Sequence, residues 1–345
     1  MADTTTKRLN IEKIVNDILG TIDREREREI VARRYGLFDR KETLEQIGEL
    51  LGITRERVRQ LEKAVVARLK ATAHAKQLPH MYEVQEAFKS EVETMGKIAR
   101  ISELSKKLTK DNTRIDQARV SFLAQLCPDL VVIDDNDHYY HAVGLKSAHD
   151  EKKIKDHVTE ITEAIKKIGE PVNAPKMAEA VGHTDEKHTE ALASTSKALA
   201  SLNGRWGLIK WPMVNPKNIR DKIYVILHEA GKHMHFNEIS DAIKRSEFKR
   251  KDVTTQAIHN ELIKDKRFVL IGRGIYALKE WGYEKGTVAD IITEVLQKAQ
   301  EPMHRDDIVR EVLKSRHVKE TTILLNLQGK QQFKRVAKAT YALAE

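Results

Sequence analysis

Two segments of this chain end in nearly the same letters, IYALKE at residues 275–280 and TYALAE at residues 340–345. Each segment closes a block that runs in the same order: an amphipathic helix, a short polar step, a second helix, a third helix and an extended stretch with aromatic residues. A repeat of about 60 to 65 residues is typical of an array of small domains, each with its own core. The blocks are residues 218–284 and 287–344, with a weaker copy at 154–211 and a fainter one at 80–145.

The best block ends in the pattern of a β-hairpin. The apolar run FVLI is followed by a turn at Gly272 and Gly274 and then by IYALKEW, and glycines between two such runs are a hairpin signal. In the faintest block, ISELSKKL would be the second helix and LVVIDDNDHYYHAVG the hairpin. Helices followed by a two-stranded wing describe winged helices.

We therefore predict a mainly α-helical chain, in which an N-terminal helix-turn-helix precedes three or four tandem winged-helix modules with small β-hairpin wings. The predicted domains are the helix-turn-helix at 1–78, a degenerate winged helix at 79–149, and winged helices at 150–216, 217–285 and 286–345.

Residues 43–70, TLEQIGELLGITRERVRQLEKAVVARLK, have the pattern of two helices joined by a tight turn. Thr43 can cap the first helix with Gln46 in a capping box, Gly52 permits the turn, and Thr54 can cap the second helix. Ile53 is expected to fill the space between the two helices. The apolar residues at helical spacing are Leu44, Ile47, Leu50 and Leu51 in the first helix and Val58, Leu61, Val65 and Leu69 in the second.

The opposite side of the second helix carries Arg55, Glu56, Arg59 and Gln60 near its start. Arginine can form two hydrogen bonds with guanine, glutamine can pair with adenine, and glutamate can accept from cytosine. These four are the candidate base-contacting residues; the alternative is an amphipathic helix with a merely solvated charged face. The candidate phosphate-contacting residues of this part are Thr43, Arg57, Lys63 and Arg68, with Lys70 beside them.

Over residues 9–72 the chain resembles region 4 of sigma-70 family primary sigma factors. IDREREREIVARRYGL, residues 22–37, is similar to the family's supporting helix and its ending, here Arg34, Tyr35, Gly36 and Leu37. TLEQIGELLGITRERVRQLE and a basic tail follow, as in the family. The resemblance implies recognition of the −35 promoter element and a contact with RNA polymerase. It also places the family's base contacts on Arg55, Glu56, Arg59 and Gln60.

Sigma factors carry region 4 behind the domains that bind the −10 element and melt DNA. Here almost nothing precedes it, and no segment elsewhere shows the aromatic, basic helix that melting requires. We therefore expect a protein that uses the module's DNA or polymerase contacts without opening promoters as a complete sigma factor.

At GRGIYALKEWGY, residues 218–284 resemble the HARE-HTH winged helix, which occurs in the delta subunit of bacterial RNA polymerase and in fusions to some restriction enzymes. The resemblance is weaker over 287–344 and weakest over 154–211. It implies a role in transcription or DNA-associated machinery, without agreed base-reading residues.

The third helix of this best block is predicted to run from about Thr254 to Lys264, with Ile258 and Leu262 inward. Its outward residues would be Gln256, His259, Asn260 and Lys264. Lys249, Arg250 and Lys251 just before it, together with Arg267 and Arg273 at the wing, are further candidate phosphate contacts, a solvated basic surface being the alternative.

The net charge of +9, from 61 basic and 52 acidic residues, favours a nucleic-acid partner. The basic excess is concentrated in residues 1–78 and 217–285, whereas 79–149 and 150–216 are near neutral and suit spacers or protein contacts. The chain has no signal peptide and no apolar run that could span a membrane, so we expect a cytoplasmic, nucleoid-associated protein. The lone cysteine, Cys127, is expected to be a buried thiol.

Three constellations that could carry metal chemistry are weak. HEAGKH, around His228, Glu229 and His233, is one residue too long for a zinc-protease motif, with His235 nearby. Asp134, Asp135 and Asp137 lack the glycine and glutamate of a calcium loop and suit a hairpin turn. Asp129 with Asp150, Glu151 and Lys152 loosely fits a magnesium nuclease, but the last three fall in a linker. We expect no metal site, no cofactor and no enzymatic activity.

The leading hypothesis is a DNA-binding transcription factor that recognises promoter-like double-stranded DNA through its helix-turn-helix, while the winged helices add contacts with DNA or RNA polymerase. The alternative is a polymerase-binding adaptor without base readout. A magnesium-dependent nuclease is the third and weakest hypothesis.

Overall fold

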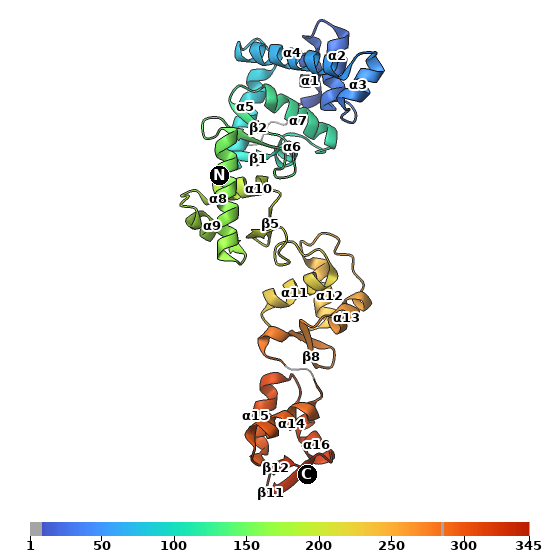
Figure 1. Cartoon of the computed structure of the whole chain (residues 1–345), viewed down its shortest axis with the longest axis vertical. Helices are drawn as coiled ribbons and strands as arrows, with labels where there is room; N and C mark the ends of the chain where they lie inside the picture. Colours follow the sequence, from blue (N-terminus) through green and yellow to red (C-terminus); the bar gives the residue numbers. More distant parts are fainter. Residues whose placement is uncertain (1–8, 284–285, 345) are drawn as a thin grey trace. The chain divides into compact units, whose positions relative to one another are not determined.

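The computed structural model describes residues 9–283 and 286–344. It divides into two compact units, one that ends at Ile209 and one that begins at Lys210. The fold is mainly helical with small antiparallel sheets, as the sequence predicts. Figure 1 shows the elements of each unit in order along the chain.

The first unit begins with four helices (blue in Figure 1) that include the predicted helix-turn-helix. The supporting helix begins at Glu25 rather than Ile22, and Gly36 ends it in the left-handed conformation at φ 67°. The four helices are α1 (Ile11–Gly20), α2 (Glu25–Tyr35), α3 (Leu44–Leu51) and α4 (Arg55–His74).

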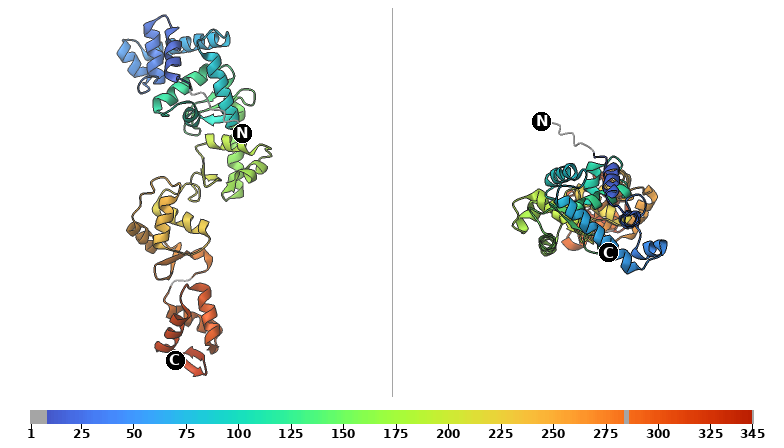
Figure 2. Two further views of the ribbon diagram at one scale, coloured as in Figure 1. Left: turned by 180° about the vertical axis from the view of Figure 1, so that it is seen from behind. Right: turned by 90° about the horizontal axis from the view of Figure 1, so that it is seen from above.

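Two further segments of the first unit share one order of elements. The first comprises α5 (Met81–Thr94), β1 (Ile98–Arg100), α6 (Ile101–Leu108), α7 (Arg114–Leu126), β2 (Leu130–Ile133) and β3 (Ala142–Leu145). The second comprises α8 (Glu151–Ile168), β4 (Val172–Asn173), α9 (Ala174–Ala180), α10 (Glu186–Thr195), β5 (Leu199–Leu202) and β6 (Arg205–Leu208). The two views of Figure 2 show α8 beside α9 and α10, which it contacts.

The second unit repeats the same order twice. Its first segment comprises α11 (Ile219–Ala230), β7 (Met234–His235), α12 (Phe236–Arg245), α13 (Thr255–Lys264), β8 (Phe268–Gly272), β9 (Ile275–Leu278) and the short 3₁₀ helix η1 (Lys279–Trp281). Its second comprises α14 (Val288–Ala299), β10 (Met303–His304), α15 (Arg305–Ser315), α16 (Glu320–Gly329), β11 (Phe333–Ala337) and β12 (Thr340–Leu343).

The polar step between the first and second helix of each segment is a short β-strand, which the sequence analysis missed. In each three-stranded sheet of the described residues, this first strand pairs antiparallel with the third strand, which also pairs with the second. Ile98 lies opposite Gly144, and Met234 lies opposite Tyr276. Each pair of helices is therefore fixed to its hairpin by backbone hydrogen bonds as well as by packing.

One hydrophobic core runs from α1 to β3, so the helix-turn-helix shares its interior with the segment that follows it. The Tyr35 and Phe122 rings lie 5.0 Å apart. Arg119, which is buried, donates from Nε to the Leu37 carbonyl at 2.7 Å and pairs with Glu12 at 3.1 Å. Cys127 is buried in this core, as predicted, and burial raises the pKa of its thiol to about 12.

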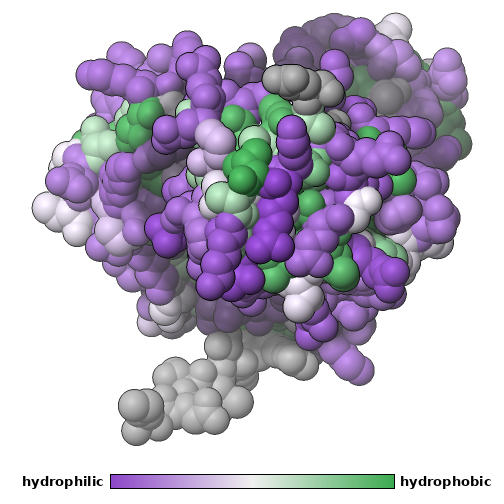
Figure 3. All heavy atoms as spheres, turned by 90° about the horizontal axis from the view of Figure 1, so that it is seen from below, coloured by the Kyte–Doolittle hydropathy of each residue, from purple (hydrophilic) through white to green (hydrophobic). Residues whose placement is uncertain are grey.

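Hydrophilic side chains predominate on the face drawn in Figure 3, with apolar ones scattered in small groups. None of the helices in the described part of the chain is both long and apolar enough to span a bilayer.

Candidate nucleic-acid interface

The turn between α3 and α4 has the geometry that the sequence predicts. Thr43 Oγ1 accepts from the Gln46 amide at 3.2 Å while Gln46 Oε1 accepts from the Thr43 amide at 2.9 Å, a complete capping box. Gly52 ends α3 in the left-handed conformation at φ 63°. Thr54 Oγ1 accepts from the Arg57 amide at 3.2 Å and caps α4. Capping residues therefore fix both ends of α3 and the start of α4.

The helix-turn-helix has a small core of its own, formed by Ile30, Ile47 and Val58. Ile53 packs against this core, as predicted for the residue between the helices, and Leu44, Leu51 and Leu61 join it. Val65 and Leu69 continue the α4 stripe into the larger core of the unit. Leu50 shares the helical spacing of these residues, but its side chain is 54% exposed, because α3 is short and only one side of it faces α4 and α2.

Gly48 is a determinant of this geometry that the sequence analysis missed. A Cβ atom at this position would lie 2.7 Å from the backbone oxygen of Ile53. Ordinary carbon–oxygen contacts are longer, so any side chain here must push the turn away from α3. The signal in the sequence was a glycine in the middle of a helix. Glycine there lowers helix stability by about 0.5–1 kcal/mol relative to alanine, so its presence indicates a packing requirement.

The exposed start of α4 carries a network centred on Glu56. Arg59 donates to both carboxylate oxygens of Glu56, from Nε at 2.8 Å and from Nη2 at 2.7 Å, and Gln60 Nε2 reaches the same group at 3.4 Å. The Arg59 hydrogen bonds lower the pKa of Glu56 to about 2, and those with Glu56 raise the pKa of Arg59. Glu56 is therefore ionised at any pH near neutrality, and it orients Arg59 and Gln60 on one face.

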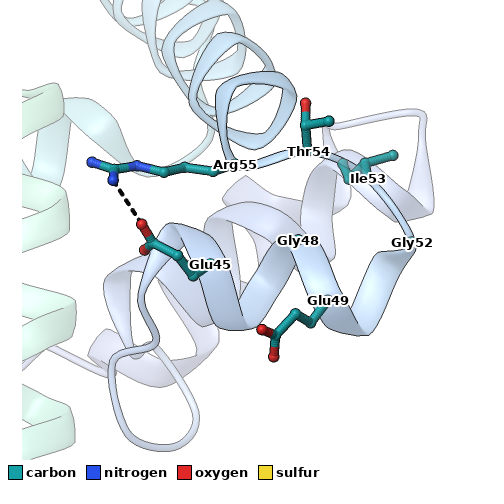
Figure 4. A pocket seen from close by; sticks show the side chains of 7 residues that line it. All are labelled: Glu45, Gly48, Glu49, Gly52, Ile53, Thr54 and Arg55. Atoms are coloured by element: carbon teal, nitrogen blue, oxygen red, sulfur yellow. Dashed lines mark ion pairs between the residues drawn. The ribbon is translucent and has the colours of Figure 1, made fainter.

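Arg55 projects from the first turn of α4 to Glu45 of α3, with Nη1 at 2.7 Å from Oε1 (Figure 4). The ion pair lies at the edge of an open hollow between the two helices, and the Glu49 side chain points away from the ion pair (Figure 4). Both side chains of the pair are more than half exposed, so the pair is available for exchange with a charged ligand. The hollow is lined by Glu45, Gly48, Glu49, Gly52, Ile53, Thr54 and Arg55.

The predicted base-contacting residues Arg55, Glu56, Arg59 and Gln60 are thus all exposed along the start of one helix. Among the phosphate candidates, Arg57 and Lys63 are exposed on the same helix. Thr43 uses its oxygen as an acceptor at the cap, which leaves its hydroxyl proton to donate. Arg68 donates to Glu27 of α2 at 2.6 Å, a contact that fixes α4 to α2.

In the second unit, Lys249, Arg250 and Lys251 lie in the connection between α12 and α13. Lys222 of α11, which is only 3% exposed, holds this connection: its Nζ donates to the carbonyls of Lys249 at 2.9 Å and Arg250 at 2.7 Å. The three basic side chains are exposed. The basic loop is thus supported from beneath by a buried ammonium group.

Helix α13 follows the prediction closely. It begins after the Thr254 cap and buries Ile258 and Leu262. Gln256, Asn260 and Lys264 are exposed, whereas His259 is half-buried, because Phe236 at the start of α12 and Tyr276 of β9 cover that side of the helix, with ring centroids 5.0 and 6.2 Å away.

The two arginines predicted at the wing differ in their surroundings. Arg273 is exposed at the turn between β8 and β9. Arg267 lies before β8, where its Nη2 contacts Asp265 at 2.7 Å and Asp221 at 3.1 Å. It therefore joins α11 to the base of the hairpin instead of extending from the wing.

The three carboxylates of the nuclease-like group have separate local partners. Asp129 accepts from Gln85 at 2.6 Å, Asp150 caps α8, and Glu151 pairs with Lys155 at 2.6 Å. In the HEAGKH region, His235 is an N-cap, since its Nδ1 accepts from the Asn237 amide at 3.2 Å.

Comparison with known proteins gives a match over the helix-turn-helix. Residues 24–71 match the family "Sigma-70, region 4", which confirms that part of the predicted resemblance. The chain is 36% identical over 74 residues to RNA polymerase sigma factor SigA of Listeria monocytogenes, covering 21% of this chain and 20% of that protein. It is 43% identical over 61 residues to RNA polymerase principal sigma factor HrdD of Streptomyces griseus, covering 17% and 18%.

A third relative, RNA polymerase sigma factor sigB of Arabidopsis thaliana, is 42% identical over 64 residues, which cover 18% of this chain and 10% of that protein. The chain therefore spans a fifth or less of the length of these relatives. The similarity concerns the region 4 helix-turn-helix.

Proposed function

We propose that this protein is a transcription factor that binds promoter-like double-stranded DNA through α4 and contacts RNA polymerase. The observation that carries the proposal is the exposed row Arg55, Glu56, Arg59 and Gln60 at the start of the second helix of a region 4 helix-turn-helix. These side-chain types suit base edges in the major groove, and the proposal assigns phosphate contacts to Thr43, Arg57, Lys63 and Arg68. The proposal includes a cytoplasmic, nucleoid-associated location and no enzymatic activity.

The four segments with the order α-β-α-α-β-β are, on this proposal, winged-helix modules of the HARE-HTH type. Their support is the repeated order of elements and the first-third-second strand arrangement. In this array the module with the basic loop, Lys249, Arg250 and Lys251 with Arg273, adds phosphate contacts, and the near-neutral modules serve as spacers or as surfaces for the polymerase.

The direct test is Arg59→Ala in the full-length chain, measured on a duplex with a −35-like element and on scrambled duplexes. Affinity for the preferred duplex should fall about 5- to 100-fold and discrimination at one base pair should relax. Arg310→Ala is the matched control, because Arg310 also pairs with an acidic residue three positions earlier, Asp307, at 3.4 Å. Equal loss of affinity on every duplex would contradict base readout.

The polymerase contact is tested with a variant in which Arg55, Arg59 and Gln60 are all alanine. If this variant no longer binds DNA but still retains purified RNA polymerase, the polymerase contact is independent of DNA, and the adaptor hypothesis is favoured. Loss of both together would count against that hypothesis.

A further inference from the structure

Four histidines gather in the first unit, away from the helix-turn-helix. His149 precedes α8, His157 lies on α8, His183 follows α9, and His188 lies on α10. The ring centroids of His157 and His183 are 5.3 Å apart, those of His149 and His188 are 4.8 Å apart, and those of His149 and His157 are 6.3 Å apart. A carboxylate, Glu160, is one turn along α8 from His157 and shares its face.

Ligand atoms of His157, Glu160 and His183 all lie within 4.8 Å of one another. In a tetrahedral zinc site with bonds of about 2.0–2.2 Å, neighbouring ligand atoms are about 3.4 Å apart. Small side-chain rotations therefore suffice to bring the three atoms around one ion. His157 and Glu160 are fixed on one helix and His183 on the connection between α9 and α10, so an ion there would join two elements.

The hydrogen bonds around His183 leave its other ring nitrogen free to bind a metal. The hydroxyl of Thr189, which is fully buried, donates its single proton to the Asp185 carbonyl at 2.9 Å. Thr189 Oγ1 also lies 3.0 Å from His183 Nδ1, and it can only accept there, so Nδ1 carries the ring proton. His183 Nε2 therefore presents a lone pair. A second-shell partner that fixes the tautomer in this way is typical of metal-binding histidines.

Two neighbouring rings hold nitrogen atoms that the described protein atoms do not satisfy. His149 is 3% exposed and neither of its ring nitrogens has a hydrogen-bond partner among the described residues. His157 Nδ1 is likewise buried without a partner there. Buried polar atoms are normally paired, and an ion is one of the recognised explanations when they are not.

We propose that His157, Glu160 and His183 bind a divalent transition-metal ion, with zinc the best match to two imidazoles and one carboxylate. The fourth position is left to water or to the His149 ring. The metal joins α8 to the α9–α10 connection, beside the place where His188 Nδ1 donates to the Gly96 carbonyl at 2.7 Å. The site therefore stiffens the packing of α8 against the α9–α10 connection within residues 150–209. It is independent of the proposed DNA contact.

The test uses the untagged full-length chain, stripped with a chelator and titrated with Zn²⁺ or Co²⁺ alone. We expect one equivalent to bind, with cobalt showing the visible absorption of a low-coordinate site, and the melting temperature to rise with Zn²⁺. His157→Gln and His183→Gln should each abolish stoichiometric binding. Glu160→Gln should weaken it at least ten-fold while leaving the fold intact, because Glu160 is exposed.

The sharpest variant is Thr189→Val, which keeps the shape but removes the oxygen that fixes His183. Metal affinity should fall about 10- to 100-fold, the range of second-shell losses. His138→Gln, in the exposed β2–β3 connection, is the control and should bind like the wild type. The proposal is overturned if the wild-type chain binds no equivalent, or if Glu160→Gln and both histidine variants bind as tightly as the wild type.

Discussion

Two helix pairs of this protein, α3–α4 and α12–α13, place positive charge in different ways. In the first pair the connection is confined to residues 52–54, and the charged side chains lie on the second helix itself. In the second pair the connection runs over residues 246–254 and carries the basic residues, whereas α13 exposes two amides, one lysine and the apolar Ile263. On the proposed function, the first pair would contact bases through side chains on the helix, and the second would contact phosphates through its basic loop.

The largest effect on stability should come from adding a side chain at Gly48, where α3 and the turn are in close contact. Gly48→Ala places a methyl group against the Ile53 carbonyl, and overpacking costs of about 1–3 kcal/mol exceed the helix-propensity gain of about 1 kcal/mol. We expect a net loss of about 1–2 kcal/mol of unfolding free energy by denaturant titration, and at least ten-fold weaker binding to the preferred duplex. Gly20→Ala is the control, since nothing lies within 4 Å of a Cβ there. If Gly48→Ala changes neither the unfolding free energy nor the binding to the preferred duplex, the turn can move away from α3 without cost.

The contrast also explains what could be predicted from the sequence. Thr43, Gly52 and Thr54 act on their own neighbours, so their roles were visible as local patterns. The first strand of each sheet was not visible, because residues such as Met234 and His235 gain their partner from a strand far along the chain. Leu50 followed the helical spacing and is nevertheless exposed, because spacing defines a face and the neighbours decide whether it is covered.

The candidate sites divide in the same way. The candidate base-contacting residues Arg55, Glu56, Arg59 and Gln60 lie on one helix, so their common exposed face could be predicted residue by residue. The group of His157, Glu160 and His183 could not, because only His157 and Glu160 share a helix, and folding alone brings His183 of the α9–α10 connection to them. The histidines around residue 233 form the more visible pattern in the sequence, and one of them, His235, caps a helix.

The second largest effect should come from removing the charge of the loop. Changing Lys249, Arg250 and Lys251 together to Gln should weaken binding about equally on every duplex and reduce the salt slope of log K by about 3. The matched control removes three exposed lysines of α8 instead, Lys152, Lys166 and Lys167. If affinity is lost on one DNA sequence only, this loop contacts bases. The two helix pairs would then no longer differ in how they recognise DNA.

A smaller effect is expected from the support beneath the loop. Lys222→Met keeps the buried stem but removes the ammonium group that holds the Lys249 and Arg250 carbonyls. Burial lowers the pKa of Lys222, so the charge is itself costly, and its removal should leave overall stability little changed. Hydrogen exchange over residues 246–254 should accelerate, and DNA affinity should fall a few-fold. Unchanged exchange would show that the loop is ordered without Lys222.

The smallest effect, and the most specific to α4, is expected from Glu56→Gln. The neutral amide releases Arg59 from its strongest partner, so affinity for DNA in general should rise a few-fold while discrimination between duplexes falls. The hydrogen bonds with Arg59 lower the pKa of Glu56 to about 2, below the usual value. The carboxylate is therefore protonated only as the pH falls toward 2. The wild type at about pH 5 should therefore still discriminate as it does near neutrality, and fluorescence anisotropy on preferred and scrambled duplexes measures both. If Glu56→Gln changes neither the affinity for the preferred duplex nor that for scrambled duplexes, Glu56 neither restrains Arg59 nor contacts a base. The selectivity proposed for α4 must then come from Arg55, Arg59 and Gln60 alone.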